Sequence, residues 1–282
     1  MDLYKETKFL MNKYNIVAKK SLGQNFLIDE NVILDAIDAA NITENDIVIE
    51  IGPGLGTLTK YLVERAKKVI CVELDNSMID ILNERFFLYK NFEVINDDIL
   101  KIDLHELIRK NKAELGAQKV KIVANLPYYI TTPIIMKLLE EKLDIESITV
   151  MIQKEVADRL TATPGQKNTG AITYSVYYYS EAKEVRTVPN TSFIPAPEVE
   201  SEVIKLTIRK KPAIEVADEE KLFKLIKIAF MQRRKTLINA VSNSNLVDKE
   251  KIKEILKELG IDERVRGENL SIKEFAKIAD RI

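Results

Sequence analysis

The chain has 282 residues, of which 46% are hydrophobic and 31% charged, a composition typical of a globular protein with one large domain, or a large and a small one. The single cysteine, Cys71, cannot form an internal disulfide, and the single histidine, His105, leaves Ser-His-Asp, Cys-His and zinc chemistry without the residues they require. The N-terminus lacks the apolar core of a signal peptide, and no window approaches the roughly 20 apolar residues of a membrane span. We therefore expect a cytoplasmic protein without a bound metal.

Between residues 47 and 153, short β-branched runs alternate with helical patterns. The predicted strands are IVIEI (47–51), KVICVEL (68–74), FEVI (92–95), VKIVAN (120–125) and SITVMIQ (147–153). The predicted helices cover 57–66, 76–89, 104–111 and 132–142. Apolar strands separated by helices are typical of a parallel sheet covered on both faces, so this region is predicted to be a doubly wound, Rossmann-like α/β domain.

The remaining patterns complete the sheet and then change to helix only. AITYSVYYYS (171–180) and SEVIKLTIRK (201–210) are predicted to be antiparallel strands at the sheet edge, which gives seven strands. After Pro212 the patterns are helical, with Asp218 as an N-cap, Gly260 as a helix end, and Ser271 and Glu274 at capping-box spacing. We therefore predict two domains: 1–211, which includes an N-terminal arm, and an all-α domain, 212–282.

A glycine loop, IEIGPGLGTLT (49–59), follows the first predicted strand. Its glycines, Gly52, Gly54 and Gly56, allow a tight turn and the close approach of a ligand, although a simple strand-to-helix turn is the alternative. The spacing is G-x-G-x-G, whereas the dinucleotide fingerprint is G-x-G-x-x-G, and this disfavours a pyrophosphate and a nicotinamide oxidoreductase.

Acidic residues stand at three predicted strand ends: Glu50, Glu73, and Asp98 with Asp97 beside it. Three acids around a glycine loop would repel a pyrophosphate and suit a nucleoside that carries positive charge, such as S-adenosylmethionine. The alternative, that such acids only cap the following helices, applies best to Asp97 and least to Glu73.

The fourth predicted strand ends in NLPYYITTPI (125–134). The side-chain oxygen of Asn125 and a backbone carbonyl of the rigid Leu126–Pro127 unit could accept both hydrogens of an exocyclic amine, and Tyr128 could stack on its base. Such an amine loses its proton only after attacking the sulfonium, so no histidine base is required. An ordinary Pro turn is the alternative.

The charge is uneven along the chain. Residues 205–240 contain ten Lys or Arg against four acids, a charge of +6, so the remainder carries −7. A polyanionic partner bound at one place would explain this pattern, and a solvated helix face is the alternative.

Taken together, these motifs resemble the ribosomal RNA adenine N6-dimethyltransferases, in particular the small-subunit enzymes whose loss gives kasugamycin resistance. The resemblance lies in the glycine loop, VELD (72–75), NDDIL (96–100) and NLPY, with KKSLGQNFL (19–27), QKEVADRL (153–160) and FIPAPEVESEV (193–203). It implies a class I methyltransferase domain that dimethylates two adjacent adenosines in the 3′-terminal hairpin of 16S rRNA. It further implies S-adenosylmethionine as donor, S-adenosylhomocysteine as product, a 30S precursor as partner and a role in 30S biogenesis, and we expect a monomer.

The resemblance also implies roles for single residues. The cofactor would be held by Gln24, Asn25, Phe26, Leu27, Glu50, Gly52, Gly54, Gly56, Glu73, Leu74, Asp97, Asp98, Ile99 and Asn125. Among these, Gly52 would hold its methionine portion, Glu73 its ribose and Asp98 its adenine amino group. The target adenine would be held by Asn125, Leu126 and Tyr128, with Phe193 closing on its other face. The RNA would be contacted by Arg233, Arg234 and Lys235 of FMQRRKTLINAV, which we expect at a helix start.

One departure from the family pattern is Ser21–Leu22, where many relatives carry a basic residue and an aromatic one, so the RNA contacts of the N-terminal arm are not carried over. Two other functions stay open. The first is the related large-subunit rRNA methyltransferase family that confers macrolide resistance, and the second is a mainly non-catalytic ribosome assembly factor. The intact NLPY motif and acidic rim favour catalysis over the second.

Overall fold

The computed structural model describes residues 2–116, 119–244 and 246–282. Contacts within the chain define two compact units. The sheet unit comprises the chain up to Ala157 together with Lys183–Ile208, and the helical unit comprises Asp158–Ala182 together with Arg209–Ile282. The division into 1–211 and 212–282 as folding domains stays a prediction, and residues 158–182 group by their contacts with the C-terminal part of the chain.

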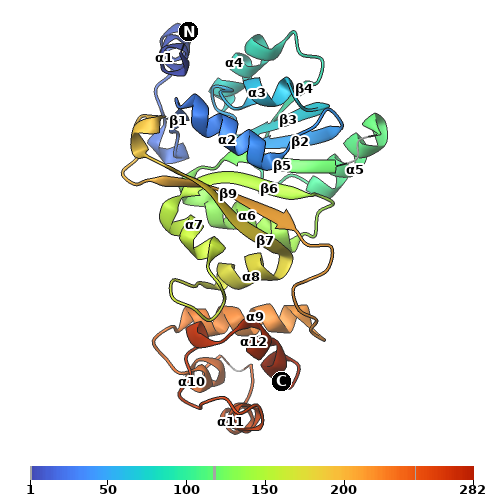
Figure 1. Cartoon of the computed structure of the whole chain (residues 1–282), viewed down its shortest axis with the longest axis vertical. Coiled ribbons are helices and arrows are strands. Elements are labelled where there is room, and N and C mark those ends of the chain that lie inside the picture. The colour runs from blue at the N-terminus through green and yellow to red at the C-terminus, as the bar shows by residue number, and fades with distance from the viewer. Residues whose placement is uncertain (1, 117–118, 245) are drawn as a thin grey trace. The chain divides into compact units, whose positions relative to one another are not determined.

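A seven-stranded sheet, in the order β4-β3-β2-β5-β6-β9-β7, forms the centre of the sheet unit (Figure 1). Its parallel part consists of β2 (Asp46–Ile51), β3 (Lys68–Glu73), β4 (Phe92–Asn96), β5 (Lys119–Asn125) and β6 (Ser147–Gln153). β9 (Ser201–Ile208) pairs antiparallel with β6, and β7 (Ser180–Val188) takes the edge beyond it. The predicted Rossmann-like, mostly parallel seven-stranded sheet is therefore confirmed.

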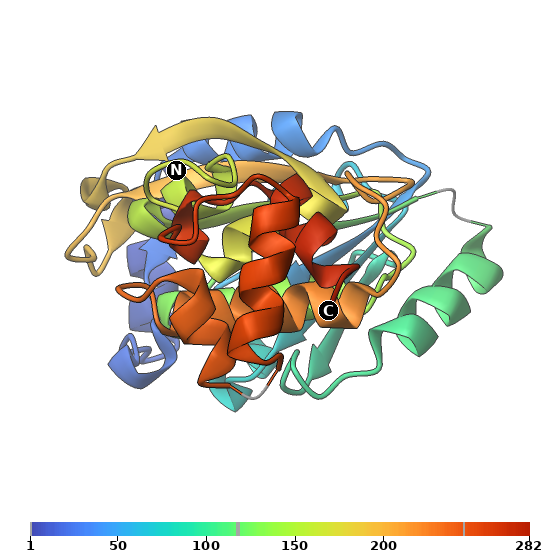
Figure 2. The same ribbon diagram turned by 90° about the horizontal axis from the view of Figure 1, so that it is seen from below.

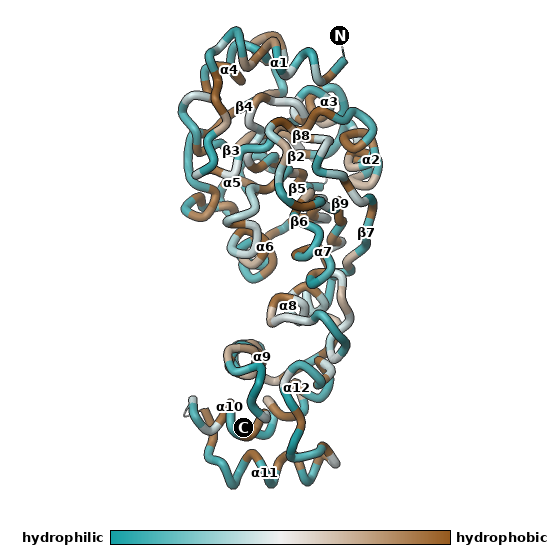
Figure 3. The backbone as a smooth tube through the Cα atoms, turned by 90° about the vertical axis from the view of Figure 1, so that its left-hand side faces the viewer, coloured by the Kyte–Doolittle hydropathy of each residue, from teal (hydrophilic) through white to brown (hydrophobic). Residues whose placement is uncertain are grey.

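Helices cover both faces of this sheet. Figure 3 shows α2 and α3 on one side of the strands and α5 and α6 on the other. The helices of this part are α1 (Leu3–Lys13), α2 (Glu30–Ala40), α3 (Thr59–Val63), α4 (Asn76–Phe86), α5 (Leu104–Leu115) and α6 (Thr131–Glu140), and the boundary between the two units falls within α7 (Lys154–Thr161). Residues of α1 to α4 share one apolar core with Val48, Cys71 and Val123 of the sheet. This core lies on one face of the sheet, and the alternate strand residues, such as Ile49 and Ile70, are buried as well, which explains why the strands are nearly continuous apolar runs.

The helical unit has its own apolar core, formed by residues of α8 (Ala171–Tyr179), α9 (Glu219–Met231), α10 (Leu237–Ser242), α11 (Lys249–Glu258) and α12 (Ile272–Ala279). Figure 2 shows α9 to α12 from below, in orange and red. The predicted caps are present, because Asp218 accepts a hydrogen bond from the Lys221 N–H, and Ser271 and Glu274 form a capping box. None of the helices in the described ranges is long and apolar enough to cross a bilayer.

The prediction of a strand at residues 171–180 is wrong, because this segment forms α8. Its β-branched and aromatic residues are typical of strands, but Tyr174 and Tyr178 are one helical turn apart and are both buried. The Tyr174 ring lies 5.3 Å from Phe230 and 5.2 Å from Phe275, measured between ring centroids. Packing against these partners decides the helix, and the edge strand is instead β7.

Candidate functional site

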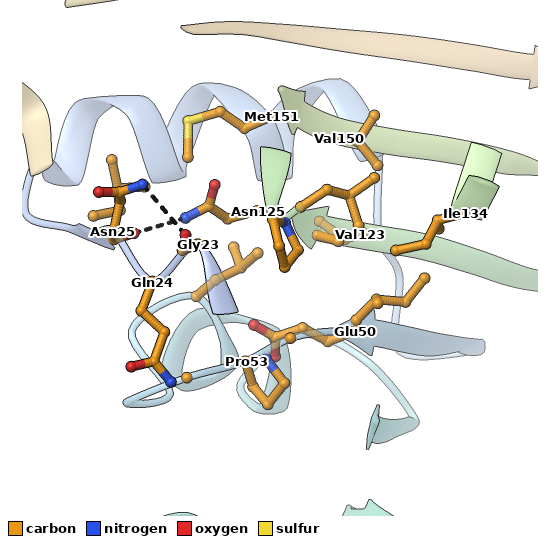
Figure 4. A pocket seen from close by; sticks show the side chains of 18 of the residues that line it. Gly23, Gln24, Asn25, Glu50, Pro53, Val123, Asn125, Ile134, Val150 and Met151 are labelled. Atoms are coloured by element: carbon orange, nitrogen blue, oxygen red, sulfur yellow. Dashed lines mark hydrogen bonds between the residues drawn. The ribbon is translucent and has the colours of Figure 1, made fainter. Parts of the chain in front are cut away.

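A deep pocket opens at the carboxyl ends of β2, β3 and β5, with an empty volume of about 1250 Å³ when its solvent-open mouth is counted. Figure 4 shows Glu50 and Asn125 among the side chains that surround it. Three carboxylates line the pocket, those of Glu50, Glu73 and Asp98, and among the described lining residues there is no Lys, Arg or His. Lys101, whose Nζ lies 3.9 Å from Asp98, is not part of this lining. Carboxylates in a lining without basic side chains favour a cationic ligand and disfavour a pyrophosphate.

The structure brings most of the predicted site residues together in this pocket. The predicted residues that line it are Gln24, Asn25, Phe26, Leu27, Glu50, Gly52, Gly54, Glu73, Leu74, Asp98, Ile99, Asn125, Leu126 and Tyr128. Among the residues predicted to hold the cofactor or the adenine, Gly56, Asp97 and Phe193 are not part of the lining.

The glycines of the loop after β2 serve two purposes. Gly52 and Gly54 have φ angles of 66° and 56°, which favour glycine. A Cβ on Gly52 would meet only Pro127, at 3.8 Å, so the space beside it is open to a ligand. At Gly56 a Cβ would lie 2.5 Å from the Phe86 ring, so this glycine allows α4 to pack closely.

Asp97 and Phe193 make contacts that support the local fold. The exposed Asp97 accepts a hydrogen bond from the Asp98 N–H at 2.7 Å and so shapes the turn after β4. Phe193 is 3% exposed and lies in β8 (Phe193–Ile194), where it pairs with Leu27 of β1 (Phe26–Leu27). Phe193 thus packs in the core beside a strand that lines the pocket, and its closing over a base stays a prediction.

Glu50 is the most deeply buried acid of the pocket, with 1% of its surface exposed. Its Oε2 accepts hydrogen bonds from Thr59 Oγ1 at 2.6 Å and from Cys71 Sγ at 3.4 Å. Burial, with a smaller contribution from the nearby Glu73, raises the pKa of Glu50 to about 7 against the effect of these two bonds. A cationic ligand in the pocket would therefore stabilise the ionised form of Glu50.

The raised pKa of Glu50 predicts how the stability of the ligand-free protein changes with pH. A carboxyl with a folded pKa above its unfolded value of 4.5 contributes its full stability below pH 4.5, and this contribution is lost as pH rises through about 7. We expect Glu50→Gln to abolish this loss, which is on the order of 3 kcal/mol between pH 4.5 and 8. Denaturant unfolding at several pH values measures it.

The matched control is Glu44→Gln, which neutralises an exposed acid of the same unit and should keep the pH dependence of the wild type. An equal loss of stability with pH in wild type and Glu50→Gln would show that Glu50 is ionised in the ligand-free protein.

Two unpartnered acceptors meet at the end of β5. Asn125 Nδ2 donates to the Asn25 carbonyl at 3.2 Å, as Figure 4 shows, and no donor among the described residues faces its Oδ1. The Leu126 N–H bonds the Met151 carbonyl at 3.1 Å, and the Pro127 carbonyl accepts two bonds from the following turn. The Leu126 carbonyl, by contrast, has no donor within the described chain. These two acceptors are the ones that the sequence pattern requires for an amine.

Aromatic side chains stand at the mouth of the pocket. Tyr128 is half-buried and its Oη lies 2.6 Å from Ser201 Oγ, which fixes the ring. Burial raises the pKa of the Tyr128 hydroxyl, so it stays neutral. Tyr129 also lines the pocket and is 53% exposed, so it is a second stacking candidate that the sequence prediction omitted. Its position beside Tyr128 in the same motif could have indicated it.

The predicted RNA-contacting residues lie in the turn between α9 and α10, and their expected place in a helix start is wrong. Arg233 is paired with Glu268 at 3.2 Å and donates to the Thr169 carbonyl at 3.1 Å. Arg234 and Lys235 are exposed. All three basic residues are thus exposed, and Arg233 in addition ties the turn to neighbouring loops.

Solved structures with the same fold include RNA methyltransferases. A dimethyladenosine transferase from Plasmodium falciparum matches with a TM-score of 0.74 and 28% identity, over 90% of this chain and 95% of that one. The 23S rRNA methyltransferase ErmE matches with a TM-score of 0.68 over 91% of this chain and 99% of that one, but at 24% identity. The ErmE likeness therefore concerns the fold alone.

Sequence relatives match almost end to end. The proteins named ribosomal RNA small subunit methyltransferase A from Alkaliphilus oremlandii and Bacillus mycoides are each 50% identical to this chain. The alignments cover 99% and 98% of this chain and 96% and 95% of those proteins. The model of the family described as ribosomal RNA adenine dimethylase matches residues 15–282. The resemblance found in the sequence motifs is thereby confirmed, and the chain belongs to the ribosomal RNA adenine dimethylase family.

Proposed function

We propose that this protein transfers methyl groups from S-adenosylmethionine to the N6 amines of two adjacent adenosines in the 3′-terminal hairpin of small-subunit rRNA, yielding N6,N6-dimethyladenosine. One observation carries this proposal: the two free acceptors of Asn125 and Leu126 open onto a pocket lined by three carboxylates and, among its described residues, by no basic side chain. The likeness to small-subunit methyltransferases favours this substrate over large-subunit rRNA.

The cofactor would lie along the strand ends. Glu73 would accept the ribose hydroxyls, Asp98 would accept from the adenine amino group, and the open face of Gly52 would receive the methionine portion. The bound cofactor supplies a methyl group on a cationic sulfur, and Glu50 and Glu73 provide the negative charge that offsets it. After the transfer, the sulfur of the product S-adenosylhomocysteine no longer carries a positive charge. We expect no metal to take part in the reaction.

The target adenine would enter beside β5. Asn125 Oδ1 and the Leu126 carbonyl would accept the two N6 hydrogens and so direct the nitrogen lone pair toward the methyl group. Tyr128, and Tyr129 at the mouth, would stack on the base. These groups position the amine and need no base before it attacks, since its proton becomes acidic only once the nitrogen carries positive charge.

Methylation of defined RNA particles tests this function. The purified protein is incubated with S-adenosylmethionine and, in separate reactions, with 30S precursor particles and with protein-free large-subunit rRNA, and mass spectrometry of nuclease fragments locates the modified bases. We expect two adjacent dimethyladenosines in the 3′-terminal fragment of small-subunit rRNA. Modification of large-subunit rRNA alone would transfer the assignment to the macrolide-resistance type. Binding to the particles without any methylation would support an assembly factor.

We further propose that the protein acts as a monomer in the cytoplasm and engages a 30S precursor partly through Arg234 and Lys235. Replacing both with Gln should lower the slope of log K against log salt by about 1.5, since each lost phosphate contact removes roughly 0.7 to 0.9. Arg233→Gln should change the slope less, because Arg233 is already paired with Glu268. Binding to 30S precursors over a salt series measures these slopes.

A matched control removes two exposed lysines of α11, with Lys249→Gln and Lys257→Gln, so that the net charge falls equally. If this control and the Arg234/Lys235 variant change the slope alike, the effect is one of overall charge and no local contact at the turn exists.

A further inference from the structure

The N-terminal segment, which we define as Lys19–Leu27, forms one wall of the pocket. Six of its consecutive residues, 22–27, line the cavity. At its C-terminal end it is fixed by the pairing of β1 with β8, and in its middle by the bond from Asn125 to the Asn25 carbonyl. A cofactor that enters or leaves the pocket passes this wall. Neither of these two attachments holds the N-terminal end of the segment, at Lys19.

That attachment is a closed ring of hydrogen bonds, which we name the clasp: Lys19, Gln24 and Asp75. Asp75 Oδ1 accepts from Lys19 Nζ and its Oδ2 from Gln24 Nε2, each at 2.7 Å. The Gln24 Oε1 in turn accepts from the Lys19 N–H at 2.8 Å. Both ends of the Gln24 amide thus bond protein groups, while its second Nε2 hydrogen has no acceptor among the described residues, so the direct role of Gln24 in holding the cofactor stays a prediction.

Asp75 joins this clasp to the strand end that carries Glu73. Its side chain is 2% exposed, and its N–H donates to Glu73 Oε1 at 2.8 Å. The same carboxylate caps α4 through Ser77, accepting from the N–H at 3.0 Å and from Oγ at 2.7 Å. Burial alone would raise the pKa of Asp75, but the bonds from Lys19, Ser77 and Gln24 lower it to about 2. The Asp75 carboxylate of the clasp is therefore ionised at neutral pH.

We propose that the clasp holds the N-terminal segment closed over the cofactor pocket, that its strength sets how fast S-adenosylmethionine dissociates, and that Lys19 is a positioning residue which never touches the cofactor. This inference rests on the proposed function of the pocket. Lys19 does not belong to the pocket lining, so its effect must pass through Asp75 and Gln24. Opening this wall would break a charge-assisted bond to a buried carboxylate and leave Asp75 without its counter-ion.

The test compares two Lys→Met variants of similar chemistry. Lys19→Met removes the cation of the clasp, whereas Lys13→Met removes the α1 lysine that pairs with Glu84 of α4 at 2.7 Å. In the cofactor-free protein we expect several-fold faster amide hydrogen exchange in residues 19–27 for Lys19→Met only. In stopped-flow experiments we expect S-adenosylmethionine to dissociate about ten times faster, the range for losing a charge-assisted hydrogen bond. Lys19→Arg should restore both values.

Steady-state kinetics and a second variant separate positioning from general damage. Lys19→Met should raise KM for S-adenosylmethionine while leaving kcat nearly unchanged, because the saturated pocket has the same acceptors for the amine. Gln24→Met should have a similar effect, and the double variant should add little, since both residues act through Asp75.

The outcomes distinguish this inference from the function on which it rests. A wild-type protein that fails to bind S-adenosylmethionine in calorimetry would overturn the proposed function itself. A wild type that binds the cofactor, with Lys19→Met matching Lys13→Met in both hydrogen exchange and dissociation rate, would overturn the clasp alone. Equal loss of kcat in Lys19→Met and Gln24→Met without a change in KM would also overturn it.

Discussion

Asn125→Ala is expected to slow methyl transfer by about 10² or more while it leaves S-adenosylmethionine affinity nearly intact. Asn125 Oδ1 has no donor among the described residues, so it is free to accept a hydrogen of the target amine. That bond strengthens as the nitrogen acquires positive charge, so its loss affects the transition state more than the bound ground state. Single-turnover assays with saturating cofactor and RNA measure the effect.

The alternative role of Asn125 is to anchor Asn25 through its Nδ2, and the same assay separates the two roles. If Asn125 served only as an anchor, Asn125→Ala would raise KM for the cofactor and leave the single-turnover rate unchanged. The control is Asn45→Ala, which truncates an exposed asparagine of the same unit and should match the wild type in both quantities.

The acidic pocket could be predicted from the sequence because the position of each acid depends only on the pattern of its own strand. Apolar β-branched runs specify buried parallel strands, and parallel strands bring their carboxyl ends to one edge of the sheet. The register then follows: Glu50 stands opposite Cys71, and Glu73 opposite Asn96. A residue placed just at the end of such a run is therefore near the others whatever the loops between them do.

What could not be predicted depends on segments far apart in the chain. The pairing of Leu27 with Phe193 joins β1 to β8, and no local sequence pattern predicts that two such short strands pair. The bond from Gln24 to Asp75 likewise arises only once the N-terminal segment lies beside the end of β3. In α8 the contacts of Tyr174 with Phe230 and Phe275 override a strand-like composition. A role assigned from a sequence motif could therefore be checked only in the structure wherever the side chain contacts a residue far away in the sequence.

Glu73→Ala is expected to weaken S-adenosylmethionine binding by roughly 2 to 3 kcal/mol, or about 30- to 150-fold in Kd. Each carboxylate oxygen accepts one backbone N–H, from Gly54 at 3.0 Å and from Asp75 at 2.8 Å, and so keeps a second acceptor site for a ribose hydroxyl. Burial raises the pKa of Glu73 and these two N–H groups oppose that effect, so a hydroxyl pair from the ligand would complete the stabilisation of the charge.

Calorimetry with Glu73→Ala, Glu73→Gln and the surface control Glu44→Ala measures this contribution of Glu73. Glu73→Gln keeps one acceptor oxygen and the shape of the side chain, so its affinity should fall between those of the wild type and the alanine variant. Because the Gly54 N–H would lose its partner in Glu73→Ala, part of the loss would come from a less ordered glycine loop, and Glu73→Gln separates this part from the ribose bonds. Wild-type affinity in a folded Glu73→Ala protein would mean that the ribose lies elsewhere in the pocket, away from the end of β3.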